Sequence, residues 1–352
     1  MGLRFAVPPL RETVAELRML AAPSPPAVHH RWMRMADEKP SALRDGGVVQ
    51  GGVREPVPLS VVETVVLTES EWKARRQAHV ERVRQWTGPH HDRKSRREKH
   101  PVLDFLFSYY SHRPARLERW HPGPGVVLAG DAAREYLDRP HYTRTDGGVT
   151  LDLTSFREAR ASTAEFVHAL LTATASRPPR LGCFGLHEWA MVYRQRPEEI
   201  RHNAWPLRLG SSGTDAVVES NRMQCGHYDA FRFFTDEARP RNTLQPTRQT
   251  QIELEQPGCL HANMDLFKWA YKLEPATPSE LVADCFDLAV RVRELDMRAS
   301  PYDLAALGYA PVPVETSDGR ADYARRQADH AHRAAPLRRR LIELCRRLLD
   351  LP

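Results

Sequence analysis

The chain has 352 residues, of which 51 are Lys or Arg and 45 are Asp or Glu, so its formal net charge is +6. A hydrophobic fraction of 41% is enough for a sizeable core, and the mean hydropathy of -0.55 indicates a charged surface. The sequence lacks the run of about 18 apolar residues that a membrane span requires, so no membrane span is expected. The positive charge favours polyanionic partners such as nucleic acid.

The cysteines and the N-terminus indicate where the protein works. The five cysteines are widely spaced and form no CxxC pair, so they indicate neither a zinc ribbon nor a disulfide framework. Unpaired cysteines fit a reducing compartment. The N-terminus lacks the basic start, apolar stretch and small-residue cleavage site of a signal peptide. We therefore expect a cytoplasmic protein.

Residues 1–57 differ in composition from the rest of the chain. They are rich in Pro, Gly, Ala and Arg and have little apolar periodicity, which predicts a disordered or extension tail. Residues 58–352 are predicted to form a single helix-rich catalytic domain. The expected fold class is mainly α with a few short β segments (α+β), in one compact domain.

The first half of this domain alternates helices with extended segments. The capping-box spacing of Thr68 and Glu71 predicts a helix over residues 71–86, which Gly88 and Pro89 are expected to end. A basic loop follows. Further helices are expected over residues 102–111, 113–120 and 156–175. Extended segments are expected at residues 125–130 and on both sides of a turn at residues 146–148.

The C-terminal half is predicted to be helical. Ser279 is expected to cap a helix that runs to Asp296 and carries an apolar stripe on one face. Residues 317–319 lead into a long basic helix, which Pro336 is expected to kink. Helix predominates, and the sequence contains no internal repeat.

Ionisable side chains lie within apolar segments between residues 183 and 272. Burying them costs several kcal/mol unless they are paired or used, so this region predicts a site. His187 and Glu188 suit a metal ligand or an acid–base couple. The zinc-protease pattern would need a second His four residues later, where Met191 stands. The alternative is a buried Glu188 paired with an arginine such as Arg194.

A glycine-containing loop at residues 209–215 precedes a short apolar run. Such a loop ahead of a helix can present backbone N–H groups to a phosphate. The alternative is an ordinary helix start, capped by Thr214 or Asp215. Asp215 and Glu219 are four residues apart and share one helix face, so a cation, a metal or a shared proton is expected between them.

His227 and Asp229 have a spacing that would place both side chains on one face of a strand. That geometry can supply two ligands to one iron ion, with His261 as a third. We expect no cofactor; if a metal is bound, the predicted ligands are His187, His227 and His261.

The segment from residue 261 to residue 272 reads as a short helix. Asp265 and Lys268 are three residues apart, which also suits a surface ion pair. Residues 294–298 end the following helix with alternating charges, for which a salt-bridge cluster is expected.

Several stretches of the chain resemble one protein family. The stretches are EKHPVLDFLFSYYSHRPARLERWHPGPGVVL, CFGLHEWAMVYR, GTDAVVES, DAFRFFT, QPGCLHANMDLFKWAYKL and SELVADCFDLAVRVRELDMRASPYDL. They resemble actinobacterial proteins labelled 3-methyladenine DNA glycosylase, over about residues 67–347. The resemblance implies base excision, in which an alkylated base is flipped from duplex DNA and its glycosidic bond is cleaved. It transfers no catalytic residue position by position.

The chemistry of base excision then assigns the candidate residues. A carboxylate must stabilise the oxocarbenium-like sugar or direct water, and the candidates are Glu188, Asp215 and Asp229. The further catalytic candidates are His187 and His227. The pocket is expected to be lined by Trp189, Tyr193 and Trp269. Phosphates are expected to be held by Arg194, Arg208, Arg232 and Lys268. The other substrate-binding candidates are His261 and Asp265.

The expected partner is alkylated duplex DNA, with no membrane contact and no identifiable protein partner. One alternative is a metal- or carboxylate-dependent enzyme that acts on a small molecule. Another is a non-catalytic nucleic-acid-binding protein that uses the basic C-terminal helix. A binding protein has no need to bury Glu188 or His227, so the burial of these residues separates the enzymes from the binder.

Overall fold

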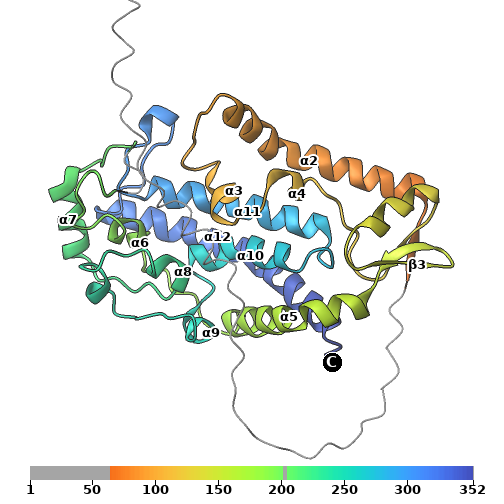
Figure 1. The fold of residues 1–352 in the computed structure, drawn as a ribbon. Coiled ribbons are helices and arrows are strands. Elements are labelled where there is room, and N and C mark those ends of the chain that lie inside the picture. The colour runs from red at the N-terminus through yellow and green to blue at the C-terminus, as the bar shows by residue number, and fades with distance from the viewer. Residues whose placement is uncertain (1–63, 201–203, 352) are drawn as a thin grey trace, which may run out of the picture. The chain divides into compact units, whose positions relative to one another are not determined.

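The computed structural model describes residues 64–200 and 204–351 of the chain (Figure 1). The tail predicted over residues 1–57 lies outside them. The described part belongs to one compact unit and is mostly helical, with one small sheet. This confirms the mainly α fold with a few short β segments. No described helix is both long and apolar enough to cross a bilayer.

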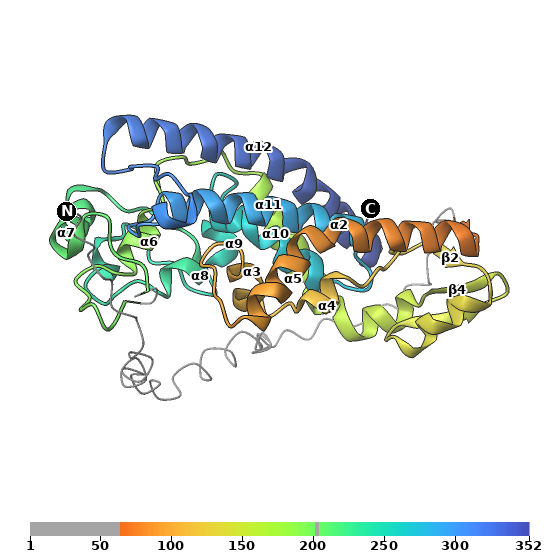
Figure 2. The ribbon, with the colours of Figure 1, turned by 90° about the horizontal axis from the view of Figure 1, so that it is seen from above.

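Long helices form the framework of the described part. They are α2 (Glu69–Ser95), α5 (Leu153–Ala175), α10 (Leu260–Lys272), α11 (Ser279–Arg298) and α12 (Ser317–Leu348). Helix α10 packs against α11 and α12, and α5 lies along α12 (Figures 1 and 2). Nearly every side chain of α10 is buried, including the polar Asn263 and Asp265. The helix therefore carries polar groups through the main core.

Shorter helices connect this framework. They are α3 (Phe105–Tyr109), α4 (Pro114–Leu117), α6 (Leu186–Ala190), α7 (Gly210–Ser220), α8 (Tyr228–Phe231), α9 (Gln251–Leu254) and the 3-10 turns η1 (Asp131–Asp138), η2 (Arg239–Arg241) and η3 (Ala305–Leu307). Helices α6, α7 and α8 lie at the end of the molecule away from the sheet in both views (Figures 1 and 2).

The sheet has four short strands, β1 (Val65–Leu67), β2 (Val126–Leu128), β3 (Tyr142–Thr145) and β4 (Gly148–Leu151), in the order β1-β2-β4-β3. Strands β1 and β2 are parallel, and the other neighbours are antiparallel. The extended segment at residues 125–130 and the turn at residues 146–148 are thus confirmed. The sheet covers a small core of its own, in which the Trp72 indole donates to the Ala129 carbonyl over 2.9 Å.

The prediction that Gly88 and Pro89 end the first long helix is wrong. Helix α2 continues through Pro89 to Ser95, over part of the predicted basic loop. A proline inside a helix removes one backbone hydrogen bond. Here the turns beyond Pro89 are held from outside, because Asp104 accepts from His90 over 2.9 Å and from Arg93 over 2.5 Å.

Two other predicted helix starts are also wrong. Ser279 does not cap α11; its hydroxyl accepts from the His121 N–H over 2.8 Å and donates to the Arg119 carbonyl over 3.1 Å, which ties α11 to the segment after α4. Helix α7 starts earlier than expected, at Gly210. Thr214 consequently lies inside the helix, where its hydroxyl donates to the Gly210 carbonyl over 2.7 Å.

Candidate functional site

Three helices supply buried ionisable side chains to one place in the core. They are His187 and Glu188 from α6, His261 and Asp265 from α10, and Arg293 and Asp296 from α11. The chain enters α6 through Gly185, whose φ of +69° favours glycine. A Cβ atom there would also lie 3.4 Å from Ala299 and from Tyr323. Gly185 therefore lets α6 approach the end of α11 closely.

A first network joins α6 to α11. His187 Nε2 and Asp296 Oδ1 are 2.6 Å apart. Arg293 Nη1 donates to Glu188 Oε1 over 2.8 Å and to Asp296 Oδ2 over 2.7 Å. The guanidinium also lies 3.7 Å from the centre of the Phe105 ring. A single buried arginine thus holds two carboxylates, one from each helix.

The alternative prediction, a buried Glu188 paired with an arginine, is confirmed, but the arginine is Arg293 and not Arg194. Arg194 is exposed, and its Nη2 donates to Glu219 over 2.9 Å. Its backbone N–H donates to Asp215 over 2.9 Å. One arginine therefore contacts both carboxylates of α7, but its charged guanidinium pairs with Glu219 alone.

A second network surrounds His227. Its Nε2 atom lies 3.5 Å from Glu255 Oε1 and 3.4 Å from Asp265 Oδ2. Lys268 Nζ donates to Asp229 Oδ2 over 2.6 Å and to Asp265 Oδ2 over 3.2 Å. Asp265 is fully buried, so the predicted surface ion pair of Asp265 and Lys268 is instead part of a core network.

His227 and Asp229 do not lie on a strand, so that prediction is wrong. His227 is the N-cap of α8, and its Nδ1 atom accepts from the Ala230 N–H over 3.3 Å. Because this segment is helical, the side chains of His227 and Asp229 do not point to one face and cannot both bind one metal ion. Asp229 reaches Lys268, whereas His227 faces Glu255 and Asp265.

His261 connects the two networks. Its ring centre lies 4.4 Å from that of His187 and 5.3 Å from that of His227. His187, His261 and Asp296 each place one ligand-type atom within 4.8 Å of the other two. Two of the three predicted metal ligands are therefore together, and Asp296 takes the place expected for His227.

Burial and neighbouring charges shift the pKa values of the site in opposite directions. Burial raises the pKa of Glu188, although Arg293 opposes this shift. Burial also disfavours the charge of Asp229, but Lys268 outweighs it and lowers the pKa of that carboxyl below its usual value. Burial and the neighbouring His187 lower the pKa of His261 to about 3, so its ring is neutral.

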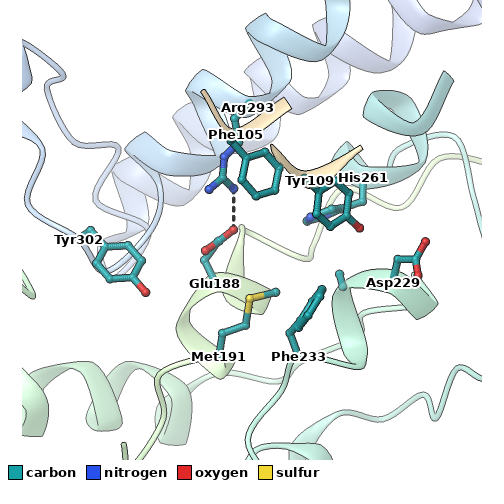
Figure 3. Close-up of a pocket in the computed structure, with 10 residues that line it drawn as sticks. Phe105, Tyr109, Glu188, Met191, Asp229, Phe233, His261, Arg293 and Tyr302 are labelled. Carbon is teal, nitrogen blue, oxygen red and sulfur yellow. Dashed lines mark hydrogen bonds and ion pairs between the residues drawn. The ribbon is translucent and has the colours of Figure 1, made fainter. Parts of the chain in front are cut away.

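A pocket opens onto both networks (Figure 3). Its polar lining consists of Glu188, Asp229, His261 and Arg293. Its other lining residues are Phe105, Tyr109, Met191, Ala230, Phe233 and Tyr302. The cavity volume is about 20 Å³, which is room for a water molecule. A second pocket is lined by His187, Cys183, Cys225, Cys259 and Glu255 among others.

The three aromatic residues predicted for the pocket lie elsewhere in the core. Trp189 is fully buried, and its indole donates to the Ala299 carbonyl over 2.8 Å. Tyr193 donates to Glu219 over 2.8 Å. Trp269 packs edge-on against Phe166, 5.6 Å between ring centres. They hold the helices around the site together.

The four cations predicted to hold phosphates all contact carboxylates. Besides Arg194 with Glu219, Arg208 forms two hydrogen bonds to Glu315, of 2.8 and 3.0 Å. Arg232 lies 3.4 Å from Asp229, and Lys268 binds the same carboxylate. Only the last two therefore lie beside the pocket, where a phosphate would compete with Asp229.

The basic C-terminal helix carries its own counter-charges. Arg325 and Arg326 both bind Asp322, at 2.8 and 2.9 Å, and Arg333 binds Asp329 at 2.7 Å. Arg340 reaches Asp284 on α11 at 2.6 Å. Much of the positive charge on α12 is thus already paired within the helix or with α11.

Sequence reasoning missed several residues of the site. The sequence pattern indicates Asp296 only as part of a salt-bridge cluster at a helix end and does not single out Arg293, although both are about 1% exposed. A signal was available, because the two charges stand three residues apart between apolar residues of the α11 stripe. Glu255 and the aromatic lining come from loops and short helices, whose packing no local pattern predicts.

No protein-family model, curated protein or solved structure matches the chain.

Proposed function

We propose that this chain is a base-excision enzyme, which hydrolyses the N-glycosidic bond of 3-methyladenine-type bases in DNA. The observation that supports it is one pocket in which two carboxylates, Glu188 and Asp229, share the wall with four aromatic rings (Figure 3). Such an alkylated base is a planar cation, which aromatic faces and carboxylates both attract. The family resemblance of the sequence points to the same reaction.

The two carboxylates suit different roles. Asp229, with its lowered pKa, is the ionised group that stabilises positive charge on the sugar. The electrons of the C1′–N bond leave with the base and neutralise it. Water adds its hydroxyl group to C1′, and its proton passes to Asp229. Glu188, with its raised pKa, is the more readily protonated group and can hydrogen-bond to a nitrogen of the departing base while keeping its proton.

The pocket must open before a base can enter, because its volume of about 20 Å³ holds only water. Phe105 and Tyr109 lie on the five-residue α3, and Phe233 follows the four-residue α8. All three rings are partly exposed. Their rotation would open the mouth while Glu188 and His261 stay fixed in the core.

The test is release of free base from methylated duplex DNA by the full chain, followed by chromatography of the soluble products. We expect catalytic release of 3-methyladenine, which falls at least about 100-fold in Asp229→Asn. The control is Asp287→Asn, an exposed carboxylate paired with Arg291 on α11. Failure of the folded wild-type chain to release any base would refute the proposal. Equal release by Asp229→Asn would refute the role of that residue.

A second candidate is an enzyme that acts on a small molecule, which the small volume of the pocket favours. The same acid and base carboxylates would serve it. This second candidate predicts that the chain releases no base from DNA. It also predicts that any DNA affinity does not fall with salt, because the protein would make no phosphate contacts.

A further inference from the structure

We propose that His187, His261 and Asp296 bind one divalent transition-metal ion in the wall between the two pockets. Their three ligand-type atoms lie within 4.8 Å of one another and come from three helices, α6, α10 and α11. His261 lines the first pocket and His187 lines the second. Such an ion would be buried and yet adjacent to the space where a substrate binds. The site would exist whatever the substrate is.

The donor set defines the class of ion. Two imidazole nitrogens and one carboxylate oxygen are the ligands of catalytic zinc sites and of non-haem iron sites. Both leave at least one coordination position for water or substrate. Magnesium and calcium prefer sites made of oxygen atoms. The site is therefore suited to Zn²⁺, Fe²⁺ or Co²⁺.

An unpartnered nitrogen supports the site independently of the distances. His261 is 5% exposed, and its Nδ1 atom is buried without a hydrogen-bond partner among the described residues. A buried polar atom without a partner costs about 1–3 kcal/mol. A bound metal ion that turned this ring toward itself would offset that cost.

The charges around the site also favour a cation. Among the described residues, Arg293, Lys268 and Arg232 are the cations that contact the carboxylates of the two networks. They face five carboxylates, namely Glu188, Asp229, Glu255, Asp265 and Asp296. Five negative groups against three positive ones leave an excess of two when all are ionised and the histidines are neutral. A divalent ion would offset this excess.

Arg293 prepares Asp296 for the ion. Its Nη1 atom donates to Oδ2 of Asp296 over 2.7 Å, so Oδ1 points at His187. Outer partners of this kind orient metal-binding carboxylates. The present His187–Asp296 separation of 2.6 Å is that of a hydrogen bond. Bonds of about 2.1 Å in tetrahedral geometry would set the two atoms about 3.4 Å apart, with the ion in place of the shared proton.

The test measures metal binding by the full chain without an affinity tag. The chain is stripped with a chelator and titrated separately with Zn²⁺, Co²⁺ and, without oxygen, Fe²⁺; bound metal is measured by calorimetry and elemental analysis. We expect one ion per chain for at least one metal. Asp296→Asn and His261→Gln should each weaken its binding at least about 10-fold.

The matched control is His112→Gln. His112 is also buried, and neither of its ring nitrogens has a hydrogen-bond partner among the described residues, but it stacks on Tyr271, away from the site. It should bind metal as the wild-type chain does. If one ligand variant does not fold, the melting temperature is measured with and without the ion instead. The ion should raise it in the wild-type chain and raise it less in the ligand variant that does fold. Folded wild-type chain that binds none of the three ions stoichiometrically would overturn the proposal, as would binding that persists unchanged in both ligand variants.

Discussion

Tyr110 donates its phenolic hydrogen to Oδ1 of Asp265 over 2.7 Å, although the two residues are 155 positions apart. Lys268 donates to Oδ2 of the same carboxylate over 3.2 Å. Both oxygens of this fully buried group therefore have partners. Helix α3 carries part of the aromatic wall of the pocket, and Tyr110 follows it directly. The contact therefore fixes the end of α3 to the central helix α10.

Tyr110→Phe should destabilise the protein by about 1–3 kcal/mol, because it removes a donor from a buried carboxylate and leaves that oxygen unsatisfied. The measurement is urea unfolding followed by circular dichroism. The matched control is Tyr193→Phe, which removes a donor from the exposed Glu219 and should cost less than about 1 kcal/mol, since water can replace the lost contact. Equal effects in the two variants would contradict the importance of burial at Asp265.

Glu274 should make the stability depend on pH. Burial raises its pKa to about 8, and the nearby Arg116 and Arg119 only partly oppose this. The folded state therefore keeps a proton on Glu274 that the unfolded state loses above its ordinary pKa of 4.5. Stability is unaffected below that value and falls as the pH rises from there to about 8.

Glu274→Gln should remove this loss. Its melting temperature should equal that of the wild-type chain at low pH and exceed it increasingly toward pH 8, because glutamine needs no proton to stay neutral. Melting curves across this range provide the measurement, with the exposed Glu158→Gln as the control. A gain in stability that is constant with pH would show that Glu274 acts by something other than its titration.

The arginines of α12 should contribute little to DNA binding. Arg325, Arg326 and Arg333 already bind carboxylates of their own helix. Changing all three to Gln should alter the affinity for duplex DNA less than about 2-fold at fixed salt. Arginines that are already paired with carboxylates do not neutralise DNA phosphates, so they release no counterions from the DNA. A comparison triple in the exposed basic segment changes Lys94, Arg97 and Lys99. The slope of log affinity against log salt concentration reports the number of phosphate contacts. If the α12 triple variant lowered this slope by about two contacts or more, the prediction would be wrong and the basic helix would contact DNA.

The fold was largely predictable because its signals are local. Local sequence patterns predict helices at α5, α10, α11 and α12, with an apolar stripe on α11, and a glycine-containing turn predicts the hairpin of β3 and β4. The errors came where distant contacts override local propensity. Asp104 holds α2 together beyond Pro89, a contact that no short sequence window contains.

The site was predictable only in part, for a related reason. Buried charge in apolar segments located His187, Glu188 and His261 correctly in one place. Their partners could not be predicted, because Arg293 and Asp296 stand more than 100 positions away from α6. Spacing alone also favoured His227 as a metal ligand, whereas its position as a helix cap turns it toward Glu255 and Asp265.

Lys268 should be the most sensitive cation of the second network. It is the partner of Asp229 and of the fully buried Asp265, at 2.6 and 3.2 Å. Although burial disfavours its charge, these carboxylates raise its pKa well above the usual value. Lys268→Met should cost about 3–5 kcal/mol, because it leaves the fully buried Asp265 without its lysine and Asp229 with Arg232 alone. Urea unfolding at neutral pH gives this value directly.

The double variant Lys268→Met with Asp229→Asn should recover part of that loss, since it removes one of the two carboxylates that lose the lysine. Lys73→Met is the control for losing a lysine from an ion pair, because its side chain and that of its partner Glu69 are 43% and 37% exposed, so that water screens the pair and the loss should be small. A Lys268→Met protein as stable as this control would mean that water or a bound cation compensates Asp265 in solution. Adding Asp229→Asn to Lys268→Met would then bring no recovery of stability. A recovery would instead indicate that Lys268 supplies the counter-charge.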